Sequence, residues 1–479
     1  MKSYEKYISK DSVQKIHENT LRILSEVGVR FENERVLEIF KSHGAKTDGE
    51  IVYISESLLK KALSTVPSSY TVYSESGPLT YGGGSAVTSS LGSNIYINDD
   101  GKIRKLVNQD VINQFKLGLM SPVLTFAHLN NFMDVSSFSE DQIAFGRMAI
   151  LLRYSDKFNV SLGANTLGLS HDKILPTIRK GYDFARAYTG ITDKSKPIMS
   201  GGLNALSPLA FDRDPLERLL ASLDEGFPAS ITPCAMPLLT APASLAGLMS
   251  TTNAEVLAGL TLCQLYAPGT GFLYGNVSGS TDMRTIQLCI GSPEAALIAY
   301  ATAGLADYYN VPFRACGGFS DAKDLDSQAG AESMMMLFAS YDCGADYAFH
   351  QIGCLGTYNV LSLEKFIIDE EIIGMVKRQL RGIDCSDSKL LFDEIKKVGP
   401  RGTFLYGRTP KVFREEFHQA VFFNKDDPNN WQNQGSVSVK EAAKAEVIRR
   451  LDAYEVPERS KDQLKMLSPF LPDEYKDKI

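Results

Sequence analysis

Residues 315–330 read Ala315-Cys316-Gly317-Gly318-Phe319-Ser320-Asp321-Ala322-Lys323-Asp324-Leu325-Asp326-Ser327-Gln328-Ala329-Gly330. A largely apolar run (311–315) leads into this segment, and a Met-rich run of helical character (332–341) follows it. Parallel α/β proteins use the same order of strand, loop and helix to present functional groups at the carboxyl end of a strand. The segment therefore predicts one strand–loop–helix unit of an α/β protein.

The same alternation of short apolar runs and helical stretches continues on both sides of this segment, from about Val123 onwards. The predicted strands are 123–129, 158–162, 197–203, 229–233, 272–277, 312–317 and 347–352, and the predicted helices include 140–154, 175–189, 215–225, 243–266 and 293–309. Seven such units predict a (β/α)8 barrel of the TIM type, in which the sequence does not place the eighth strand. An open doubly wound sheet is the alternative, but no GxGxxG motif follows a strand, so a dinucleotide site has no support.

The two ends of the chain have a different pattern. Apolar residues at helical spacing (13–27) and a hairpin-type turn (98–101) indicate a mixed α and β region at the start. Polar helical segments at 411–418 and 438–451 indicate a helical region at the end. The predicted organisation is therefore an α+β N-terminal region packed on the barrel (1–120), the barrel (121–400) and a helical C-terminal extension (401–479).

Composition narrows the class of protein. With 479 residues the chain can bury a large core, and its net charge of −7, without a run of basic residues, argues against a nucleic-acid partner. No apolar run approaches the roughly 18 residues of a membrane span. The seven cysteines are scattered and form no CxxC pair, which predicts free thiols in a reducing cytoplasm. A small molecule or a protein is the expected partner.

The carboxyl ends of the predicted strands are rich in Asn, Gly and aromatic residues but poor in Lys and His. His350 is the best-placed histidine, and His128 is the next. No strand end offers a lysine for a Schiff base, and no GxSxG motif offers a serine nucleophile. His350, Cys316 and Cys354 could be imagined as zinc ligands, but the strands carry no HxH or CxxC pair, so no metal is expected.

Each of these features also has a purely structural interpretation. His350 could be a hydrogen-bonded core histidine, and Gly317 with Gly318 could simply permit a tight turn. The acidic residues of the loop could cap the helix that follows, because carboxylates favour a helix N-terminus. Taken singly, none of these residues identifies a function.

Taken together, three segments resemble the trimethylamine methyltransferase family. The run Gly317–Lys323, continued by Asp326–Gly330 and Glu332, is similar to the family signature. The segment Phe413-Arg414-Glu415-Glu416-Phe417, followed by Asn430-Trp431, is similar to the closing segment of the family, and Leu24–Val29 is similar to an element near its start. The resemblance implies a (β/α)8 barrel that passes a methyl group from a methylated amine to the Co(I) form of a separate corrinoid protein.

The resemblance also implies a substrate class. The founding enzyme of the family carries pyrrolysine, whereas this chain contains only the twenty standard residues. Members without pyrrolysine act on quaternary amines such as glycine betaine, proline betaine, carnitine or butyrobetaine. The chain has no Asp-x-His-x-x-Gly motif for cobalamin, so the corrinoid is expected on the partner and no cofactor on this chain. A homo-oligomer is also expected, because the family often forms oligomers.

Such a reaction needs positioning more than acid–base groups, so no catalytic residue is predicted. Aromatic faces suit the cation, and donors or cations suit a substrate carboxylate. On one strand His350 and Gln351 face opposite sides unless a bulge intervenes, and His350 is favoured. The alternatives are a non-catalytic quaternary-ammonium binding protein and a zinc-dependent barrel methyltransferase. The candidate substrate-binding residues are Tyr96, Tyr274, Asn276, Arg314, His350, Gln351 and Tyr358, with Gly317, Gly318, Asp321 and Gln328 in the nearby loop.

Overall fold

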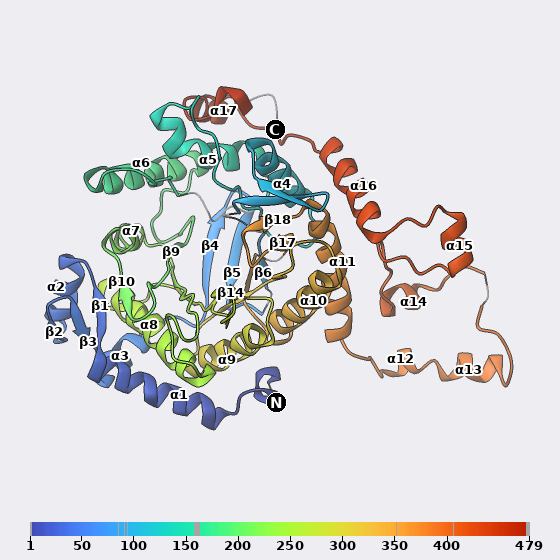
Figure 1. The fold of residues 1–479 in the computed structure, drawn as a ribbon, viewed down its shortest axis with the longest axis horizontal. Helices are drawn as coiled ribbons and strands as arrows, with labels where there is room; N and C mark the ends of the chain where they lie inside the picture. The colour runs from blue at the N-terminus through green and yellow to red at the C-terminus, as the bar shows by residue number, and fades with distance from the viewer. Residues whose placement is uncertain are drawn as a thin grey trace.

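The protein has a mixed α/β fold with short strands at its centre and helices around them (Figure 1). The computed structural model describes residues 2–84, 86–90, 92, 94–157, 163–350, 352–405 and 407–475. In the part of the chain that is described, no helix is long and apolar enough to span a membrane. All seven cysteines are free thiols.

Parallel strands form the centre of the fold. β9 pairs with β11 and β11 with β12, and Tyr274 at the end of β12 forms a parallel bridge to Phe313, just ahead of β15. β15 pairs with β16 and β16 with β6, beyond which Ser89 bridges to Phe126. All the pairings from β9 to Phe126 are thus parallel. Its strands are β6(Val87–Thr88), β9(Gly201–Leu203), β11(Ala229–Ile231), β12(Phe272–Tyr274), β15(Arg314–Cys316) and β16(Tyr347–Phe349).

Five of the predicted strands are confirmed, as shorter segments, by β9, β11, β12, β15 and β16. The predicted strand 123–129 is reduced to the single bridge at Phe126, and the predicted strand 158–162 lies outside the described residues. β6 supplies a further parallel strand, between β16 and Phe126. The sequence indicates extended chain around β6 but assigns it to the N-terminal region, because a strand of two residues carries no readable sign of its distant partner.

Helices cover the outer side of the strands. The predicted helices 140–154 and 293–309 are confirmed with the same bounds, and the other three are confirmed with small shifts at their ends. α8 is buried on nearly all sides, because the strands lie beneath it and α1, α2 and α3 of the N-terminal region lie over it. These helices are α5(Glu140–Tyr154), α6(His171–Thr189), α7(Arg213–Asp224), α8(Leu245–Tyr266), α9(Pro293–Tyr309), α10(Ser327–Asp342) and α11(Leu363–Leu380).

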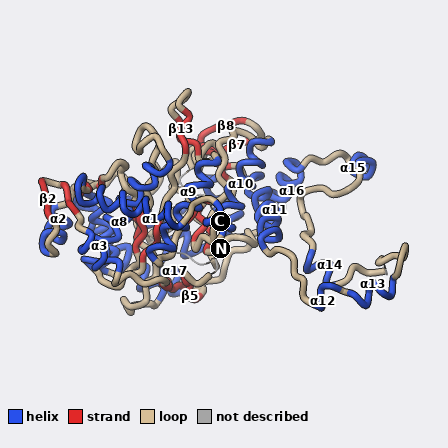
Figure 2. Tube along the Cα trace, turned by 90° about the horizontal axis from the view of Figure 1, so that it is seen from below, coloured by secondary structure: helices blue, strands red, loops and turns tan. Residues whose placement is uncertain are grey.

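The N-terminal region closes one end of the strand array. The hairpin of β4 and β5 brings Tyr81 against Tyr347, at 6.0 Å between ring centroids, and Tyr73 donates to Pro197 ahead of β9. A second hairpin, of β7 and β8, pairs with β18 beyond the carboxyl end of β16. Figure 2 shows β5 on one side of the molecule and β7, β8 and β13 on the opposite side. The N-terminal elements are η1(Ser3–Lys6), α1(Lys10–Arg22), η2(Ile23–Val27), β1(Val29–Phe31), α2(Glu34–Ser42), β2(Lys46–Asp48), β3(Ile51–Tyr53), α3(Glu56–Leu63), β4(Tyr70–Ser74), β5(Gly77–Tyr81), β7(Tyr96–Asp99), β8(Lys102–Lys105) and α4(Asn108–Met120).

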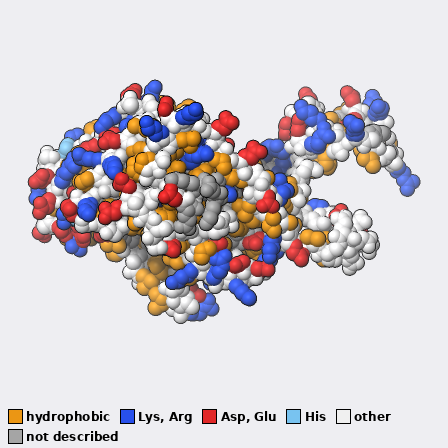
Figure 3. All heavy atoms as spheres, turned by 90° about the horizontal axis from the view of Figure 1, so that it is seen from above, with side chains coloured by type: hydrophobic (Ala, Val, Ile, Leu, Met, Phe, Trp, Pro, Cys, Tyr) orange, Lys and Arg blue, Asp and Glu red, His pale blue; other side chains and the backbone are white. Residues whose placement is uncertain are grey.

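The C-terminal region includes an arm that projects from the body of the molecule (Figure 1). The arm contains α12, α13, α14 and α15, and the chain then returns to the body in α16, which packs on α11 and α4. On the face in Figure 3, acidic and basic side chains are interspersed over both body and arm. The remaining elements are β10(Ala210–Phe211), β13(Ser280–Asp282), β14(Gln287–Cys289), β17(Cys354–Leu355), β18(Val360–Leu361), α12(Asp387–Leu390), α13(Phe392–Val398), α14(Lys411–Glu416), α15(Pro428–Asn433), α16(Val439–Asp452), α17(Lys461–Leu467) and η3(Asp473–Tyr475).

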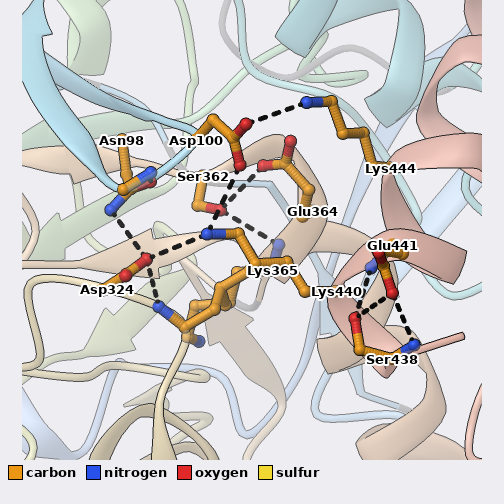
Figure 4. A network of polar contacts seen from close by, with 12 residues as sticks. Asn98, Asp100, Asp324, Ser362, Glu364, Lys365, Ser438, Lys440, Glu441 and Lys444 are labelled. Carbon is orange, nitrogen blue, oxygen red and sulfur yellow. Dashed lines mark hydrogen bonds and ion pairs between the residues drawn. The ribbon is translucent and has the colours of Figure 1, made fainter. Parts of the chain in front are cut away.

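The return helix α16 is tied to the carboxyl end of the strand array by the polar network in Figure 4. Lys440 lies 3.6 Å from a carboxylate oxygen of Asp100 and 3.5 Å from one of Asp324, and Lys444 lies 3.2 Å from Asp100. Asn98 donates to Asp324 at 3.2 Å. Asp324 of the signature segment thus holds the β7–β8 hairpin and α16 together.

The carboxyl group of Glu255 on α8 is fully buried. It accepts hydrogen bonds from the Ser207 hydroxyl at 2.9 Å and from the Leu209 amide at 2.7 Å. Burial raises the pKa of Glu255 to about 7, although the two hydrogen bonds oppose the rise. Since the pKa is higher in the folded than in the unfolded state, this group favours folding most below about pH 4.5, and its contribution is lost as the pH rises towards 7.

We expect Glu255→Gln to change the pH dependence of stability. Glutamine keeps an acceptor for the Leu209 amide but does not ionise. The free energy of unfolding of the variant, relative to that of the wild type, should therefore rise by about 2 kcal/mol between pH 5 and pH 8. Urea titrations of both proteins at the two pH values measure this difference. Glu455→Gln, at an exposed position, is the control and leaves the pH dependence unchanged. Parallel pH curves for wild type and Glu255→Gln would contradict the prediction.

Candidate active site

Arg314 on β15 occupies the inner face of the strand array, on the side away from the helices. Its Nη1 donates to Thr232 Oγ1 at 3.5 Å, although β12 lies between the two strands that carry them. The guanidinium also lies over the Phe349 ring, 4.2 Å from its centroid. Gly275 at the end of β12 leaves room for this crossing, since a Cβ there would stand 2.2 Å from Thr232 Oγ1. Arg314 is therefore held across the carboxyl end of three neighbouring strands.

A second guanidinium, that of Arg147, enters from α5. Its Nη1 donates to Asn131 Oδ1 at 3.4 Å. The Nε atoms of Arg147 and Arg314 are both buried and have no hydrogen-bond partner in the part of the chain that the structure describes. Burial lowers the pKa of Arg147 to about 10 and also lowers that of Arg314, but both remain cations at neutral pH.

Two buried histidines lie beside these arginines. Burial, and then the charges of Arg147 and Arg314, lower the pKa of His128 to about 3, so its ring is near both guanidiniums. His350 adopts a left-handed backbone (φ 53°), and its Nδ1 accepts the Gly92 amide at 3.3 Å. Burial, Arg314 and His128 hold the pKa of His350 well below its usual value. Both histidines are therefore neutral at pH 7.

The four residues Arg147, Arg314, His128 and His350, hereafter the inner cluster, carry positive charge that no carboxylate balances. Neither arginine forms a salt bridge within the described ranges, and no carboxylate affects either pKa. In those ranges no three His, Cys, Asp or Glu side chains gather as metal ligands. Cys354 instead donates its thiol to the Thr357 carbonyl. The inner cluster is thus suited to bind an anion.

The structure corrects the placement of two predicted site residues. The Tyr274 hydroxyl donates to Asn253 of α8 at 2.8 Å, and Asn276 donates to Thr252 of the same helix at 3.0 Å. Both side chains therefore face the helices, because alternation along β12 turns them away from the inner face. They cannot line the inner cluster.

The other predicted residues lie nearer the carboxyl end of the array. Tyr358 is partly buried. Burial raises the pKa of Tyr358, and Cys234 raises it further. Cys234 is in turn close to Arg314. Tyr96 is 37% exposed on the β7–β8 hairpin. Gln351 lies outside the described residues. Of the predicted set, the structure thus brings Arg314 and His350 together, and Tyr358 lies near Cys234, a neighbour of Arg314.

The loop of the signature segment is held by polar contacts, of which the one from Lys365 is fully buried. Lys365 Nζ donates to the Gly318 carbonyl at 3.1 Å, and the Gly317 amide donates to the Phe349 carbonyl at 2.8 Å. Gln328 donates to Glu332, which in turn accepts the Asp321 amide at 2.7 Å. These contacts fix the path of the chain directly after β15.

Asp321 joins this loop to two others. Its carboxylate accepts the Gly291 amide at 3.0 Å, beyond β12, and the Thr357 hydroxyl at 2.9 Å, beyond β16. Asp326 caps α10 by accepting the Ala329 amide at 3.0 Å, as the structural interpretation of the acidic loop predicts. The aspartates of the segment therefore shape the loops around the site and do not enter the inner cluster.

We expect Asp321→Asn to destabilise the protein by about 1–3 kcal/mol. The asparagine amide places a donor where the carboxylate accepts N–H and O–H donors, so one buried donor is left unpaired. The free energy of unfolding in urea measures this cost. Asp324→Asn, in the same loop but half exposed, is the matched control. Its free energy of unfolding should fall by less than about 1 kcal/mol. Equal losses in the two variants would contradict the role given to Asp321.

Sequence reasoning missed Arg147. It lies in the interior of a helix and has no strand-end position to draw attention to it. The available signal was its place in α5 between the buried Phe145 and Met148, where a charged side chain needs a reason.

Comparison with known proteins adds an independent finding. Residues 2–476 match the model of a family described as trimethylamine methyltransferase (MTTB). The chain is 36% identical to a proline betaine:corrinoid methyltransferase of Eubacterium limosum, over 99% of this chain and 98% of that protein. It is also 36% identical to an L-carnitine:corrinoid methyltransferase of the same organism, over 98% of both chains. The crystal structure of the monomethylamine methyltransferase of Methanosarcina barkeri aligns over 96% of both chains, with 10% identity and a TM-score of 0.46.

Proposed function

Since the chain belongs to the trimethylamine methyltransferase family, we propose that it transfers a methyl group from a carboxylate-bearing quaternary amine to the Co(I) corrinoid of a partner protein. The substrate class is that of proline betaine, carnitine, glycine betaine and butyrobetaine. The two relatives named above, which match along their whole length, support this class.

The fold proposed for this activity is a closed (β/α)8 barrel. The parallel order from β9 through β6 to Phe126 occupies seven positions of such a barrel. The inner cluster then lies at the carboxyl end of the barrel, where enzymes of this architecture hold their substrates.

The observation that carries the proposal is the unbalanced positive charge of the inner cluster. A buried cation is costly unless an anion or a set of acceptors compensates it. A betaine carboxylate would supply acceptors for the free Nε atoms of Arg314 and Arg147. A substrate that is only a cation, such as trimethylammonium or choline, would instead add positive charge beside two arginines.

The inner cluster has no general acid, and the reaction does not need one. In an in-line displacement the methyl carbon forms its bond to cobalt while the C–N bond breaks. The electron pair of that bond stays on nitrogen, which leaves as a neutral tertiary amine. Co(I) supplies the nucleophile, so this chain has only to hold the substrate with its methyl group directed outward.

His350 contributes a neutral donor to this arrangement. Because its Nδ1 accepts the Gly92 amide, its proton is on Nε2, which can donate to a substrate carboxylate. Tyr358, next to the inner cluster, is the proposed aromatic contact of the ammonium group, with Tyr96 at the outer edge. Gln351 remains a further candidate for orienting the carboxylate.

The test is methyl transfer to free cob(I)alamin, followed by the loss of its absorbance. The panel contains glycine betaine, proline betaine, carnitine and butyrobetaine, with trimethylamine and choline as substrates that lack a carboxylate. We expect turnover of at least one betaine and none of the last two. If betaines bind in calorimetry but none consumes cob(I)alamin, the protein is a binding protein and the proposal fails.

A further inference from the structure

Three loops at the carboxyl end of the strand array present large apolar side chains to solvent. They follow three neighbouring strands, β9, β11 and β12. The exposed fraction of these side chains lies between 45% and 58%. The residues, hereafter the apolar rim, are Leu206, Leu238, Leu239, Met283 and Ile286.

The apolar rim is held in place by hydrogen bonds rather than carried on free loops. The Leu206 amide donates to the Ala210 carbonyl at 2.8 Å, and the Leu238 amide donates to the Ala241 carbonyl at 2.9 Å. The hairpin of β13 and β14, which carries Met283 and Ile286, is joined to the neighbouring loop where Thr281 donates to the Pro237 carbonyl at 2.9 Å. A preformed apolar surface of this kind is typical of a docking site.

Two rim residues also have an unfavourable backbone conformation. Leu238 has φ 67° and Ile286 has φ 56°, in the left-handed region that suits glycine. For a β-branched residue such as Ile286 this conformation is rare and costs free energy. Glycine or asparagine would remove the cost, but neither would present a large apolar side chain. The strain is therefore consistent with a role for the side chains themselves.

The apolar rim continues directly from the inner cluster. The loop after β11 begins at Thr232, which accepts a hydrogen bond from Arg314, and reaches Leu238 six residues later. The hairpin of β13 and β14 projects on the same side of the molecule as β7 and β8, opposite the hairpin that closes the amino end (Figure 2). The apolar rim therefore borders the inner cluster at this end of the array, on the side of β9, β11 and β12.

We propose that the apolar rim is the docking surface for the corrinoid protein. This inference rests on the proposed function, because an in-line displacement requires cobalt within about 3–3.5 Å of the methyl carbon, on the side away from nitrogen. The domain that carries the corrinoid must then contact the loops around the site. A second copy of this chain bound permanently to the rim would instead obstruct that approach. The interface is transient, because the partner must leave after each transfer.

The experiment compares two acceptors in the same enzyme variants. One is free cob(I)alamin, and the other is the purified corrinoid protein that the wild-type enzyme methylates fastest, reduced to Co(I). For Leu238→Ser/Met283→Ser we expect the KM for the corrinoid protein to rise at least about tenfold. Transfer to free cob(I)alamin and the KM for betaine should stay within about twofold. Leu206→Ser, in the third loop, should act in the same direction.

The matched control is Ile383→Ser/Phe392→Ser. Both residues are at least as exposed as the rim but lie at the base of the arm and within it, and the variant should leave both acceptors unaffected. The proposal is overturned if the rim variants leave the KM for the corrinoid protein unchanged. It is also overturned if the rim variants slow transfer to free cob(I)alamin as much as transfer to the corrinoid protein. It is also overturned if they only dissociate a dimer of this chain. A wild-type enzyme that methylates neither acceptor would instead count against the proposed function.

Discussion

Arg314→Met lowers kcat/KM for a betaine by at least about thirtyfold in methyl transfer to free cob(I)alamin. Truncating one partner of a buried, hydrogen-bonded charge pair costs about 2–5 kcal/mol. In the proposed site the other partner is the substrate carboxylate, so we expect the loss in substrate binding and positioning. Arg314→Lys should recover only part of it, because an ammonium lacks the flat, forked geometry that a carboxylate accepts.

The stability of the substrate-free enzyme separates this role from a structural one. Arg314 has an unpaired Nε in a buried position, so its removal should leave the free energy of unfolding unchanged or raise it. Arg186 is the matched control: it is also buried, but it pairs with Glu225 at 3.0 Å. Arg186→Met should lower stability without changing the order of preference among betaines. Loss of stability in Arg314→Met, with betaine kinetics unchanged, would assign Arg314 to the fold.

Lys365→Met is expected to destabilise the protein by about 3–5 kcal/mol, the largest effect on stability among these variants. Lys365 and Asp369 form a fully buried ion pair, with Nζ 2.7 Å from a carboxylate oxygen. Lys365 also holds the Gly318 carbonyl after β15, and Asp369 accepts the Gly353 amide after β16. Methionine would leave the Asp369 carboxylate buried with one N–H donor.

A double variant tests whether the charge itself is responsible. Lys365→Met/Asp369→Asn removes the stranded carboxylate and should recover part of the lost stability, as measured by urea unfolding. Lys60→Met is the matched control, because Lys60 forms the same i,i+4 pair with Glu56 on the surface, and this variant should lose far less stability than Lys365→Met. If the double variant is less stable than Lys365→Met alone, the unpaired charge is not the cause.

The fold was predictable wherever a pattern extended over several turns or strands. α5 and α9 have the predicted bounds because Ser139 and Ser292 cap their N-termini, and the left-handed Asn310 ends α9. The place of β6 in the parallel array escaped prediction because its partners lie elsewhere in the chain. The strand expected at 123–129 is a single bridge, because apolar composition does not determine how many residues pair.

The candidate site was predictable only in part, for a related reason. Arg314 and His350 could be identified because they stand near strand ends. Tyr274 and Asn276 stand at a strand end too, but the side a residue faces depends on the register of β12, which the sequence does not reveal. Arg147 reaches the inner cluster from a helix, and only the packing of α5 against the array shows it.

The position of β6 has a consequence for how the protein is made. Val87 and Thr88 leave the ribosome before most of the chain, yet their partners on β16 are synthesised more than half of the chain later. At about 5–20 residues per second, that interval lasts some tens of seconds. During this time the early segment has no strand to pair with on that side, and the array cannot be joined at β6 until synthesis has passed Phe349. Chaperone dependence should therefore be concentrated at this one late step of assembly.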